Sequence, residues 1–440
     1  MPANDKRFSF VSMGMPGDTF GVVRFKGQEA LSTLYQFEIE LVAWDPELDM
    51  NEVIQNPAYL TILRNHGDMS FNGMLSEFEQ KHQVGAACFY RAVLVPRVWW
   101  LSQNQSNQVL LDANIEDICD DILRSADFTD DDFEIKLEKD HPKMDYICQY
   151  RESHLSFMQR LMEREGIYYY FAQTAGREKM IITDTRIAHD FHPLSWFAYY
   201  RPPGMQDYNF SFESVRNFSC RQKMIPQTVR LKTYNWEHPG MDLECSEEVF
   251  EEGRGEVYIY GDNFKTEQEG KRLAAIRAEE ILCWKESYFG DSDAPFLQPG
   301  YIFSLFEHFR SSFNQRYMTV EVSHEGNQSA YMLAGISREL AGREQEPTYF
   351  NSFTAIPGGV QFRPCRKTEK PRFYGSLNAK IDAAGDGTYA ELNENGCYKV
   401  KLPFDRADRQ GGKASAWIRM MQPYAGSNYG IHFPLHKGAE

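Results

Sequence analysis

Alternation of apolar and polar residues is the feature that most restricts the fold of this 440-residue chain. In the segment LYQFEIELVA, Phe37, Ile39 and Leu41 alternate with glutamine and glutamate residues. A period of two is typical of a β-strand that buries one face and exposes the other. Further strand-like segments, AYLTIL, SFNGML and YRAVLV, follow between turn-rich pieces. The N-terminal part is therefore predicted to form a β-barrel or β-sandwich.

The period changes to that of a helix in the segment NIEDICDDILRSADF. Asn114 suits the N-cap of this helix. The apolar residues have the spacing of one helical face: Ile115, Ile118, Cys119, Ile122 and Leu123. In the following DFTDDDFE, the aspartates 130–132 lack the glycine and the distal glutamate of a calcium-binding loop. We interpret them as a solvated acidic turn.

A second helix is predicted in YICQYRESHLSFMQRLMEREGIYYYF, residues 146–171. Ser153 can cap its start, and Gly166 lies where helices commonly end in a left-handed residue. One apolar stripe runs along it: Leu155, Met158, Leu161 and Met162. The segment IYYYF then predicts a strand, and EKMIITD predicts its hairpin partner.

The charges of this segment raise the question of an active site. Glu163 and Glu165 are two residues apart on a helix and point in different directions, which is poor geometry for the paired carboxylates of a glycosidase. We interpret the other polar residues as ion-pair and hydrogen-bond partners that fix the helix: Glu152, His154, Arg160 and Arg164. The segment is predicted to be structural, with its tyrosines forming part of a wall.

Residues 188–357 again predict strands and loops, with one helix in EGKRLAAIRAEEILCW. Leu273, Ile276 and Leu282 give this helix an apolar side. The pair NPAYLTIL and SFNGMLSEFE resembles the pair QPGYIFSLF and QRYMTVEVSHE. Each pair has a proline, a strand that begins at Tyr59 or Tyr301, and a second strand that ends on acidic residues. This similarity is a weak indication of two related barrels.

The C-terminal part begins with a linker rich in proline and cations, IPGGVQFRPCRKTEKPRFYG. Beyond it, Asn395-Gly396 predicts a β-hairpin, and Tyr398, Val400 and Leu402 alternate with lysines. Trp417 lies in SAWIRMMQPYAG, a segment compatible with the core of a small barrel or with an aromatic platform for carbohydrate. We favour the core.

Composition excludes several classes of function. The net charge of −16 argues against a protein that mainly neutralises the phosphates of nucleic acid or an anionic membrane. The start has no apolar stretch of signal-peptide length, and no later segment is long enough for a membrane helix. We therefore expect a soluble, cytoplasmic chain that is exported, if at all, without a Sec-type signal.

No recognisable catalytic or metal-binding motif occurs in the sequence. The eight cysteines are scattered singly, which favours a reducing compartment. His189 and His192 in HDFH would need further ligands to bind a metal, so a solvent-facing loop is predicted. A nucleophile elbow, an HExxH motif and a phosphate-binding loop are all missing. We predict no catalytic residue, no metal and no cofactor.

Four motifs occur in the same order as in one family. These are GQEALSTLYQFEIELVA, the segment 146–171, FRPCRKTEKPRFYG and AWIRMMQPYAG. Together they resemble VgrG, the spike protein of bacterial type VI secretion, from about Phe8 to Glu440. The structural signature residues are Gln149, Tyr150, Arg151, Glu152, Phe157, Leu161, Glu165, Gly166, Tyr168 and Trp417.

The resemblance implies a homotrimer related to the baseplate hub and spike base of contractile phage tails. Two barrels per subunit would form a pseudo-sixfold ring that adapts a hexameric tail tube to a threefold needle. The implied partners are the tail-tube protein, baseplate proteins, a PAAR-type tip protein and effectors. The valine-glycine-rich β-helix of relatives is missing, so we expect tip and effector contacts to involve regions outside this sequence.

The predicted fold is mainly β with α+β insertions. The expected parts are a tube-type barrel (1–100), an α+β insert carrying the signature helix and hairpin (101–187), a second tube-type barrel with a helical insertion (188–357), a linker (358–376) and an incomplete module of the oligonucleotide/oligosaccharide-binding (OB) type (377–440). The predicted function is a structural spike and hub component, not an enzyme. The alternatives are a prophage tail hub and a peptidoglycan-degrading enzyme.

Overall fold

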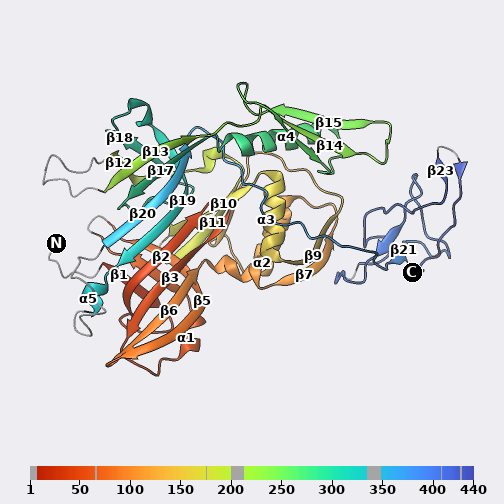
Figure 1. Ribbon diagram of the computed structural model, residues 1–440. Helices are drawn as coiled ribbons and strands as arrows, with labels where there is room; N and C mark the ends of the chain where they lie inside the picture. Colours follow the sequence, from red (N-terminus) through yellow and green to blue (C-terminus); the bar gives the residue numbers. More distant parts are fainter. Residues whose placement is uncertain are drawn as a thin grey trace.

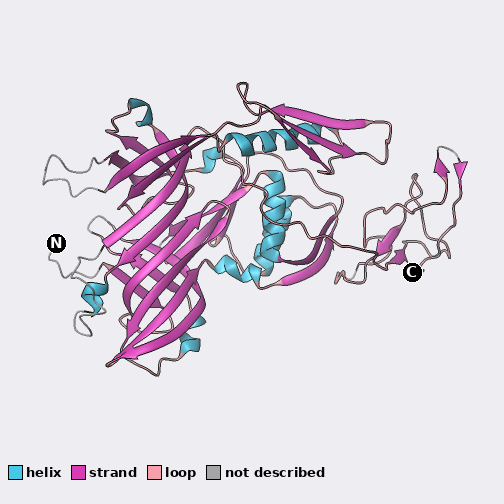
Figure 2. Cartoon of the chain, in the orientation of Figure 1, coloured by secondary structure: helices cyan, strands magenta, loops and turns pink. Residues whose placement is uncertain are grey.

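The computed structural model describes residues 7–64, 67–174, 176–199, 213–333, 348–407, 409–426 and 429–440. The described chain is mainly β with few helices, in agreement with the predicted fold class (Figure 2). The alternating segment is a strand in which Phe37, Ile39 and Leu41 are completely buried. Among the described helices, none is long and apolar enough to cross a membrane.

The first strands close into a barrel. They are β1 (Phe8–Ser12), β2 (Gly21–Ala30), β3 (Thr33–Ala43), β4 (Ala58–Ile62), β5 (Met69–Val84) and β6 (Ala87–Val95), with the short helix α1 (Met50–Ile54) between β3 and β4. The order around this first ring is β1-β2-β3-β6-β5-β4, and the pair Ser9 and Gly21 closes it. Aromatic side chains fill it: Phe8 packs edge-to-face on Phe25 at 5.1 Å.

A second ring repeats this order. Its strands are β12 (Phe191–Tyr199), β13 (Ser214–Gln222), β17 (Glu286–Ser292), β18 (Ile302–Phe306), β19 (Arg316–Asn327) and β20 (Thr348–Pro357). The order is β12-β13-β17-β20-β19-β18, and β18 returns to β12. The segments that begin at Tyr59 and Tyr301 occupy the same place in the two rings, so the predicted relation is confirmed. One strand differs, because β12 is parallel to both neighbours whereas β1 is antiparallel to both of its neighbours.

Strands β2 and β19 join the two rings side by side (Figure 1). Residues 24–30 pair antiparallel with residues 321–327. Buried His324 of β19 contacts Glu29 of β2 through Nε2 at 2.9 Å and the Tyr349 hydroxyl through Nδ1 at 2.7 Å. The seam therefore combines a backbone ladder with a buried polar contact. The short helix η3 (Ser311–Phe313) lies in the connection between β18 and β19, and α5 (Ser329–Leu333) follows β19 and contacts β2.

Between the rings, the chain forms an α+β insert. Its elements are η1 (Arg97–Ser102), β7 (Gln105–Leu110), α2 (Ile115–Ser125), β8 (Phe133–Lys136), β9 (Ile147–Ser153), α3 (His154–Glu165), β10 (Tyr168–Thr174), β11 (Arg177–Thr183) and η2 (Arg186–Ala188). Asn114 caps α2 as predicted, because its side chain accepts a hydrogen bond from the Asp117 amide at 2.7 Å. The predicted hairpin is also confirmed, since β10 pairs antiparallel with β11.

One part of the insert contradicts the sequence interpretation. Asp132 is buried rather than solvated, and it accepts hydrogen bonds from the Thr129 amide at 2.8 Å and hydroxyl at 2.7 Å. It also pairs with Arg97. Asp130 and Asp131 are exposed as predicted. One internal carboxylate, that of Asp132, therefore holds the turn. Three consecutive aspartates in the sequence do not indicate which one is buried.

A small sheet and one long helix project from the second ring. The sheet contains β14 (Thr228–Tyr234), β15 (Asp242–Glu248) and β16 (Glu256–Tyr260), and α4 (Glu267–Leu282) packs on it. Leu273 and Ile276 are buried as predicted, but Leu282 is exposed at the last residue of the helix, so its predicted place on the apolar side is wrong. Figure 1 shows that α4 lies near the end of α3.

The C-terminal module has only short strands among its described residues: β21 (Lys380–Asp382), β22 (Lys399–Lys401), β23 (Ala425–Gly426) and β24 (Tyr429–Gly430). Asn395-Gly396 forms a turn, but the predicted hairpin is wrong, because β22 pairs with β21 instead. Trp417 is 39% exposed and lies near the Lys399 ammonium, 5.0 Å from its ring centroid. Strands of two or three residues do not cover this ring, so the predicted core position is wrong.

Candidate functional site

The candidate site is the junction where the signature helix α3 meets α4 and the linker. Ser153 caps α3, since its Oγ accepts a hydrogen bond from the Ser156 amide at 3.1 Å. Gly166 ends the helix with φ of 73°, a conformation that favours glycine. A Cβ at Gly166 would lie 2.7 Å from Cγ2 of Ile276 in α4. The helix end is therefore shaped for close contact with α4.

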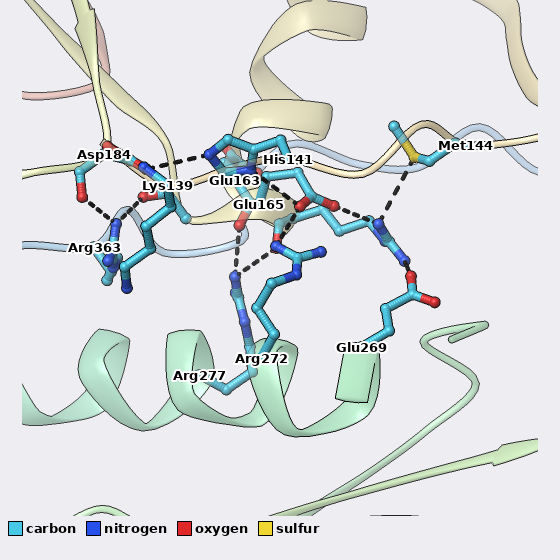
Figure 3. Close-up of polar contacts among 12 residues, drawn as sticks. Lys139, His141, Met144, Glu163, Glu165, Asp184, Glu269, Arg272, Arg277 and Arg363 are labelled. Carbon is cyan, nitrogen blue, oxygen red and sulfur yellow. Dashed lines mark hydrogen bonds and ion pairs between the residues drawn. The ribbon is translucent and has the colours of Figure 1, made fainter. Parts of the chain in front are cut away.

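Glu165 lies at the centre of the junction, where its side chain is only 3% exposed. It accepts a hydrogen bond from Nη1 of Arg272 at 2.7 Å (Figure 3). It forms a second ion pair with Arg164. His141 is its third partner, at 3.4 Å. Burial alone would raise the pKa of Glu165, but these partners outweigh burial and lower the pKa to about 2. Glu165 is thus an ionised carboxylate inside the protein.

His141 bridges two buried carboxylates. Its Nδ1 faces Glu165, and its Nε2 lies 3.2 Å from Oδ2 of Asp184. Asp184 also accepts hydrogen bonds from the backbone amides of Glu138 at 2.8 Å and Lys139 at 3.1 Å. Two ionised carboxylates can only accept, so both ring nitrogens must donate and the imidazole is protonated. Burial lowers the pKa of His141, but Asp184 and Glu165 outweigh it and raise the pKa above its ordinary value.

Two buried arginines complete the junction at the C-terminal end of α3. Arg277 of α4 donates from Nη2 to the carbonyl oxygens of Glu163 at 2.7 Å and Arg164 at 3.1 Å. Arg363 of the linker donates from Nη1 to the carbonyl oxygens of Gly166 at 2.8 Å and Asp184 at 2.7 Å. The last carbonyls of a helix lack partners within it and carry partial negative charge, so cations suit this place.

The linker is firmly attached to the rest of the molecule. Arg363 is 1% exposed, and its Nε also donates to Glu279 of α4 at 2.6 Å. The Glu163 carboxylate accepts from the Thr368 amide at 3.0 Å and hydroxyl at 2.7 Å. Arg366 forms a bidentate pair with Asp262, with both distances 2.6 Å. The segment predicted as an extended linker is irregular in backbone but docked along α3 and α4.

Gln149 and Glu152 of the signature fix the start of α3. Gln149 is fully buried, accepts from Nε2 of Gln108 at 2.8 Å and donates to the Glu152 carbonyl at 3.1 Å. The buried Glu152 carboxylate accepts from Nε of Arg160 at 2.8 Å and from Nη2 at 2.6 Å. His154 contacts Gln149 at 3.3 Å. The predicted role of these polar residues as structural partners is confirmed.

Tyr150 and Arg151 lie where the insert meets the C-terminal part of the chain. The Tyr150 ring contacts Phe373 at 5.9 Å and Phe404 at 5.2 Å between centroids. Arg151 is exposed with φ of 49°, and its amide donates to Oδ1 of Asn107 at 2.8 Å. A positive φ is uncommon for arginine and marks a constrained backbone. This backbone turn lies beside the contact between Tyr150 and the C-terminal module.

The remaining signature residues are apolar packing. Phe157, Leu161 and Tyr168 are buried, as is Tyr169, so the wall predicted from the tyrosines is confirmed. The Tyr168 hydroxyl contacts Nε2 of His189 at 2.7 Å, and Nδ1 of His189 donates to the Gly300 carbonyl at 2.7 Å. His189 is therefore buried and the predicted solvent-facing loop is wrong; the side chain of His192 lies outside the described residues. Burial lowers the pKa of His189 to about 4, so the ring is neutral.

The arrangement provides anchoring rather than reactive groups. Both Glu163 and Glu165 are engaged in hydrogen bonds, and no group of three or more histidine, cysteine or acidic side chains suited to a metal occurs among the described residues. A hollow of about 210 Å³ lies on the second ring, lined by residues of β13, β17, β19 and β20. It is built from elements other than α3. The carboxylates therefore serve the junction.

Most polar residues of the junction were not predicted from the sequence. They are His141, Asp184, Arg272, Arg277 and Arg363. Four of them lie within quoted segments: Arg363 in FRPCRKTEKPRFYG, Arg272 and Arg277 in EGKRLAAIRAEEILCW, and Asp184 in EKMIITD. These segments were interpreted as a linker, a helix and a hairpin strand. The local signal that could have indicated a buried charge is Arg363, which lies between the segment VQF and a proline.

Comparisons with known proteins agree with this fold. The family model described as phage tail baseplate hub (GPD) matches residues 28–330. The Pseudomonas aeruginosa type VI secretion system spike protein VgrG4b is 28% identical over 436 residues, which cover 98% of this chain and 53% of that protein. The chain spans about half the length of the curated relatives it matches first.

Solved structures show the same architecture. The E. coli c3393 protein superposes with a TM-score of 0.68 at 19% identity, and the match covers 93% of this chain and 92% of that one. That protein is described as a component of the type VI secretion system with structural similarity to T4 bacteriophage tail proteins gp27 and gp5. The 43 kDa tail protein of prophage MuSo2 from Shewanella oneidensis gives a TM-score of 0.52 at 8% identity, covering 80% and 98%. The family match covers more than half of the residues and both described rings contribute strands to it, so this chain belongs to the phage tail baseplate hub (GPD) family.

Proposed function

We propose that this chain is the hub and spike base of a bacterial type VI secretion apparatus. The observation that carries the proposal is the pair of closed rings with one strand order, joined side by side. Three copies around an axis would place six similar rings in a circle, which suits a hexameric tail tube at one end and a threefold needle at the other. The similarity to the spike protein VgrG4b supports this apparatus.

The proposal includes the following assembly. The chain forms a homotrimer in the cytoplasm, contacts the tail-tube and baseplate proteins, and is exported by the apparatus without a Sec-type signal. The two rings with their insert (1–100, 101–187 and 188–357) form the tube-facing part, and the linker (358–376) leads to an OB-type module (377–440). Its role is mechanical, so no catalytic residue or cofactor takes part.

The junction around α3 suits a part that bears load. Force applied to the C-terminal module can enter the body of the protein through the linker, through Tyr150, and through the contacts of Asp405 and Arg409 with the Val109 backbone. Arg363 and Thr368 hold the linker on α3, Arg366 holds it on the segment before α4, and Nζ of Lys367 donates to the Thr33 hydroxyl at 2.9 Å. These contacts distribute the force over both helices and the first ring.

Two experiments test this proposal. Light scattering on the purified chain should give three times 51.1 kDa at micromolar concentration. In the native host, the full protein should appear in the medium only when the contractile sheath is functional. A monomer at every concentration would contradict the homotrimer, and export that continues without the sheath would contradict the type VI assignment.

A prophage tail hub is the second candidate, because the chain also superposes on the tail protein of prophage MuSo2. Deleting the gene would then abolish virions and leave protein secretion unchanged. A peptidoglycan-degrading enzyme is a weaker alternative, since Glu163 and Glu165 are engaged by Thr368 and by Arg272. We expect zymography on cell-wall material to be blank, and a band abolished by one carboxylate substitution would contradict the structural role.

A further inference from the structure

The small sheet that projects from the second ring has an open edge. Its strand order is β15-β14-β16, and residues 228–232 of β14 pair in parallel with residues 256–260 of β16. No described strand pairs with the other edge of β16. Figure 1 shows β14 and β15 extending away from the two rings. The open edge of β16 therefore lies outside both rings.

Two hydrogen bonds show which backbone groups of β16 face this edge. The Thr228 amide donates to the Gly255 carbonyl at 3.4 Å, and the Gly261 amide donates to the Lys232 carbonyl at 2.9 Å. Successive residues of a strand direct their N–H and C=O groups to opposite sides, so the odd-numbered residues from 255 to 261 face β14. The even-numbered residues direct theirs to the open edge: Glu256, Tyr258 and Tyr260. These outward groups are available to an added strand.

The side chains along the open edge are mainly aromatic. Tyr258 is 53% exposed and Tyr260 is 64% exposed, whereas Val257 and Ile259 pack against the core beneath α4. Exposed strand edges in soluble proteins are commonly protected by lysine, proline or a bulge. From Val257 to Tyr260 the sequence has no lysine or proline, and the pairing with β14 shows no bulge. Two exposed tyrosines beside unpaired backbone groups therefore suit a partner strand.

The exposed face of this sheet is acidic. Its charged residues are four carboxylates and two cations: Asp242, Glu244, Glu248, Glu256, Arg230 and Lys232. Nε of Arg230 donates to Glu256 at 2.8 Å, and Nζ of Lys232 lies 2.8 Å from Oδ1 of Asp242. Both cations are therefore already neutralised by carboxylates of the same face.

Further negative charge lies at the turn that leads into β16. Glu248, Glu251 and Glu252 are exposed, and none of the three forms an ion pair within the described part of the chain. Arg254 is the one cation between β15 and β16. A partner that binds beside this turn should therefore carry positive charge.

We propose that the open edge of β16 binds an extended strand of another protein that carries arginine or lysine at alternate positions. The added backbone would pair with the outward groups of Glu256, Tyr258 and Tyr260, as in other cases of strand addition. Its cations would lie on the exposed face, over the tyrosine rings and towards the acidic turn. The acidic face disfavours a second copy of the same edge, because like charges would meet. This contact is independent of the proposed hub function.

Fluorescence anisotropy with a labelled peptide tests the site on the whole chain. The probe is a nonapeptide of alternating arginine and valine, and its control has glutamate in place of arginine. We expect saturable binding of the arginine peptide below about 1 mM and no binding of the glutamate peptide. Failure of the arginine peptide to bind, or equal binding of both peptides, would overturn the proposal.

The variant Tyr258→Pro separates strand addition from a general attraction between a cationic peptide and an acidic protein. The substitution removes one outward N–H without a change of charge, and the neighbouring residues keep their bonds to β14. It should weaken binding of the arginine peptide about tenfold or more. Tyr258→Val is the matched control, since it keeps the N–H and loses only the ring, and it should weaken binding about threefold. Equal affinity of wild type and Tyr258→Pro would overturn strand addition.

Methylated peptides give a second measurement on the unaltered chain. An added strand directs every second N–H to β16, so N-methylation at those positions alone blocks pairing. One peptide is methylated at its arginines and the other at its valines. With the cations on the exposed face, a loss of about tenfold or more from the arginine set indicates antiparallel addition, and the same loss from the valine set indicates parallel addition. Equal affinity of the two peptides would overturn the proposal.

Discussion

Replacing Glu165 by glutamine should show how much the buried junction contributes to the free energy of unfolding. The substitution keeps the shape of the side chain and removes its charge. Arg272, Arg164 and His141 then face a neutral amide instead of a carboxylate. Removing one partner of a buried ion pair costs roughly 3 to 5 kcal/mol in measured cases, because the other charge is left uncompensated. We therefore expect a loss of stability at the lower end of this range.

The pKa of Glu165 gives an independent magnitude. It falls from an ordinary 4.5 to about 2 in the folded chain, where burial opposes the shift and the hydrogen bond from His141 and the two arginine charges dominate. At about 1.4 kcal/mol per unit, this shift corresponds to about 3 kcal/mol of stability at pH 7. A depressed folded pKa stabilises above the unfolded pKa and ceases to do so as the pH falls. The contribution should therefore be complete above about pH 6 and below half by pH 3.

Urea unfolding at a series of pH values measures both properties. The free energy of unfolding of Glu165→Gln should be about 3 kcal/mol below wild type at pH 7, and the two proteins should converge towards pH 2. Exposed Glu251→Gln is the matched control, with an expected change within about 0.5 kcal/mol. A loss below about 1 kcal/mol at pH 7, or a loss equal at pH 7 and pH 3, would refute this account of Glu165.

Three further substitutions test the same junction. Gly166→Ala should cost about 2 kcal/mol in the free energy of unfolding, since its φ of 73° disfavours alanine and its Cβ would meet Ile276; a change below about 0.5 kcal/mol would contradict the close approach. Arg363→Met should leave the Gly166 and Asp184 carbonyls unpaired at about 1 to 3 kcal/mol each, and limited proteolysis should then cut the linker at least several-fold faster than in wild type. The pKa of His141 is raised, so its contribution to the free energy of unfolding is present below about pH 6.5 and is lost as the pH rises through the folded pKa. The variant His141→Gln should remove this loss of stability with rising pH. An unchanged pH dependence in the variant would contradict this role of His141.

Local features of the fold could be predicted because they depend on neighbouring residues. The caps Asn114 and Ser153 and the left-handed Gly166 act within one or two helical turns. The alternation around Phe37 depends on one strand and one buried face. The relation between the segments at Tyr59 and Tyr301 was visible because both rings place the same strand pair at the same point.

Two partners of Glu165 could not be predicted, because they come from distant segments. His141 and Arg272 are separated from it by 24 and 107 positions, and no periodicity relates such separations to contacts. A charged residue in sequence is more often exposed than buried, so the default interpretation is a solvated face. The prediction of a solvent-facing loop at His189 was wrong for the same reason. A polar loop sequence does not show that both ring nitrogens of the histidine have partners inside the protein.

The errors in the C-terminal module have a different cause. Asn395-Gly396 correctly predicts a turn, but the segment of Trp417 forms only an isolated bridge between Ile418 and Tyr398 instead of a strand. The outcome depends on which segments pair and which segments cover the apolar side chains. β22 pairs with β21, which lies before the turn by more than ten residues, and the short strands leave Trp417 partly exposed. Local patterns predict that an element forms, whereas partner choice depends on the surrounding sheet.

The seam between the rings and the junction at α3 use two different kinds of interaction. The seam between β2 and β19 is a backbone ladder, which any residue with an amide can supply, so it can be repeated between rings whose side chains differ. The junction instead uses charged side chains with fixed directions, which bond to partners from different elements. Buried ion pairs add little net stability compared with apolar packing, but each misplacement leaves a charge unpaired. The ladder thus joins two rings whose side chains differ, whereas the ionic junction fixes one geometry of the linker, where direction matters.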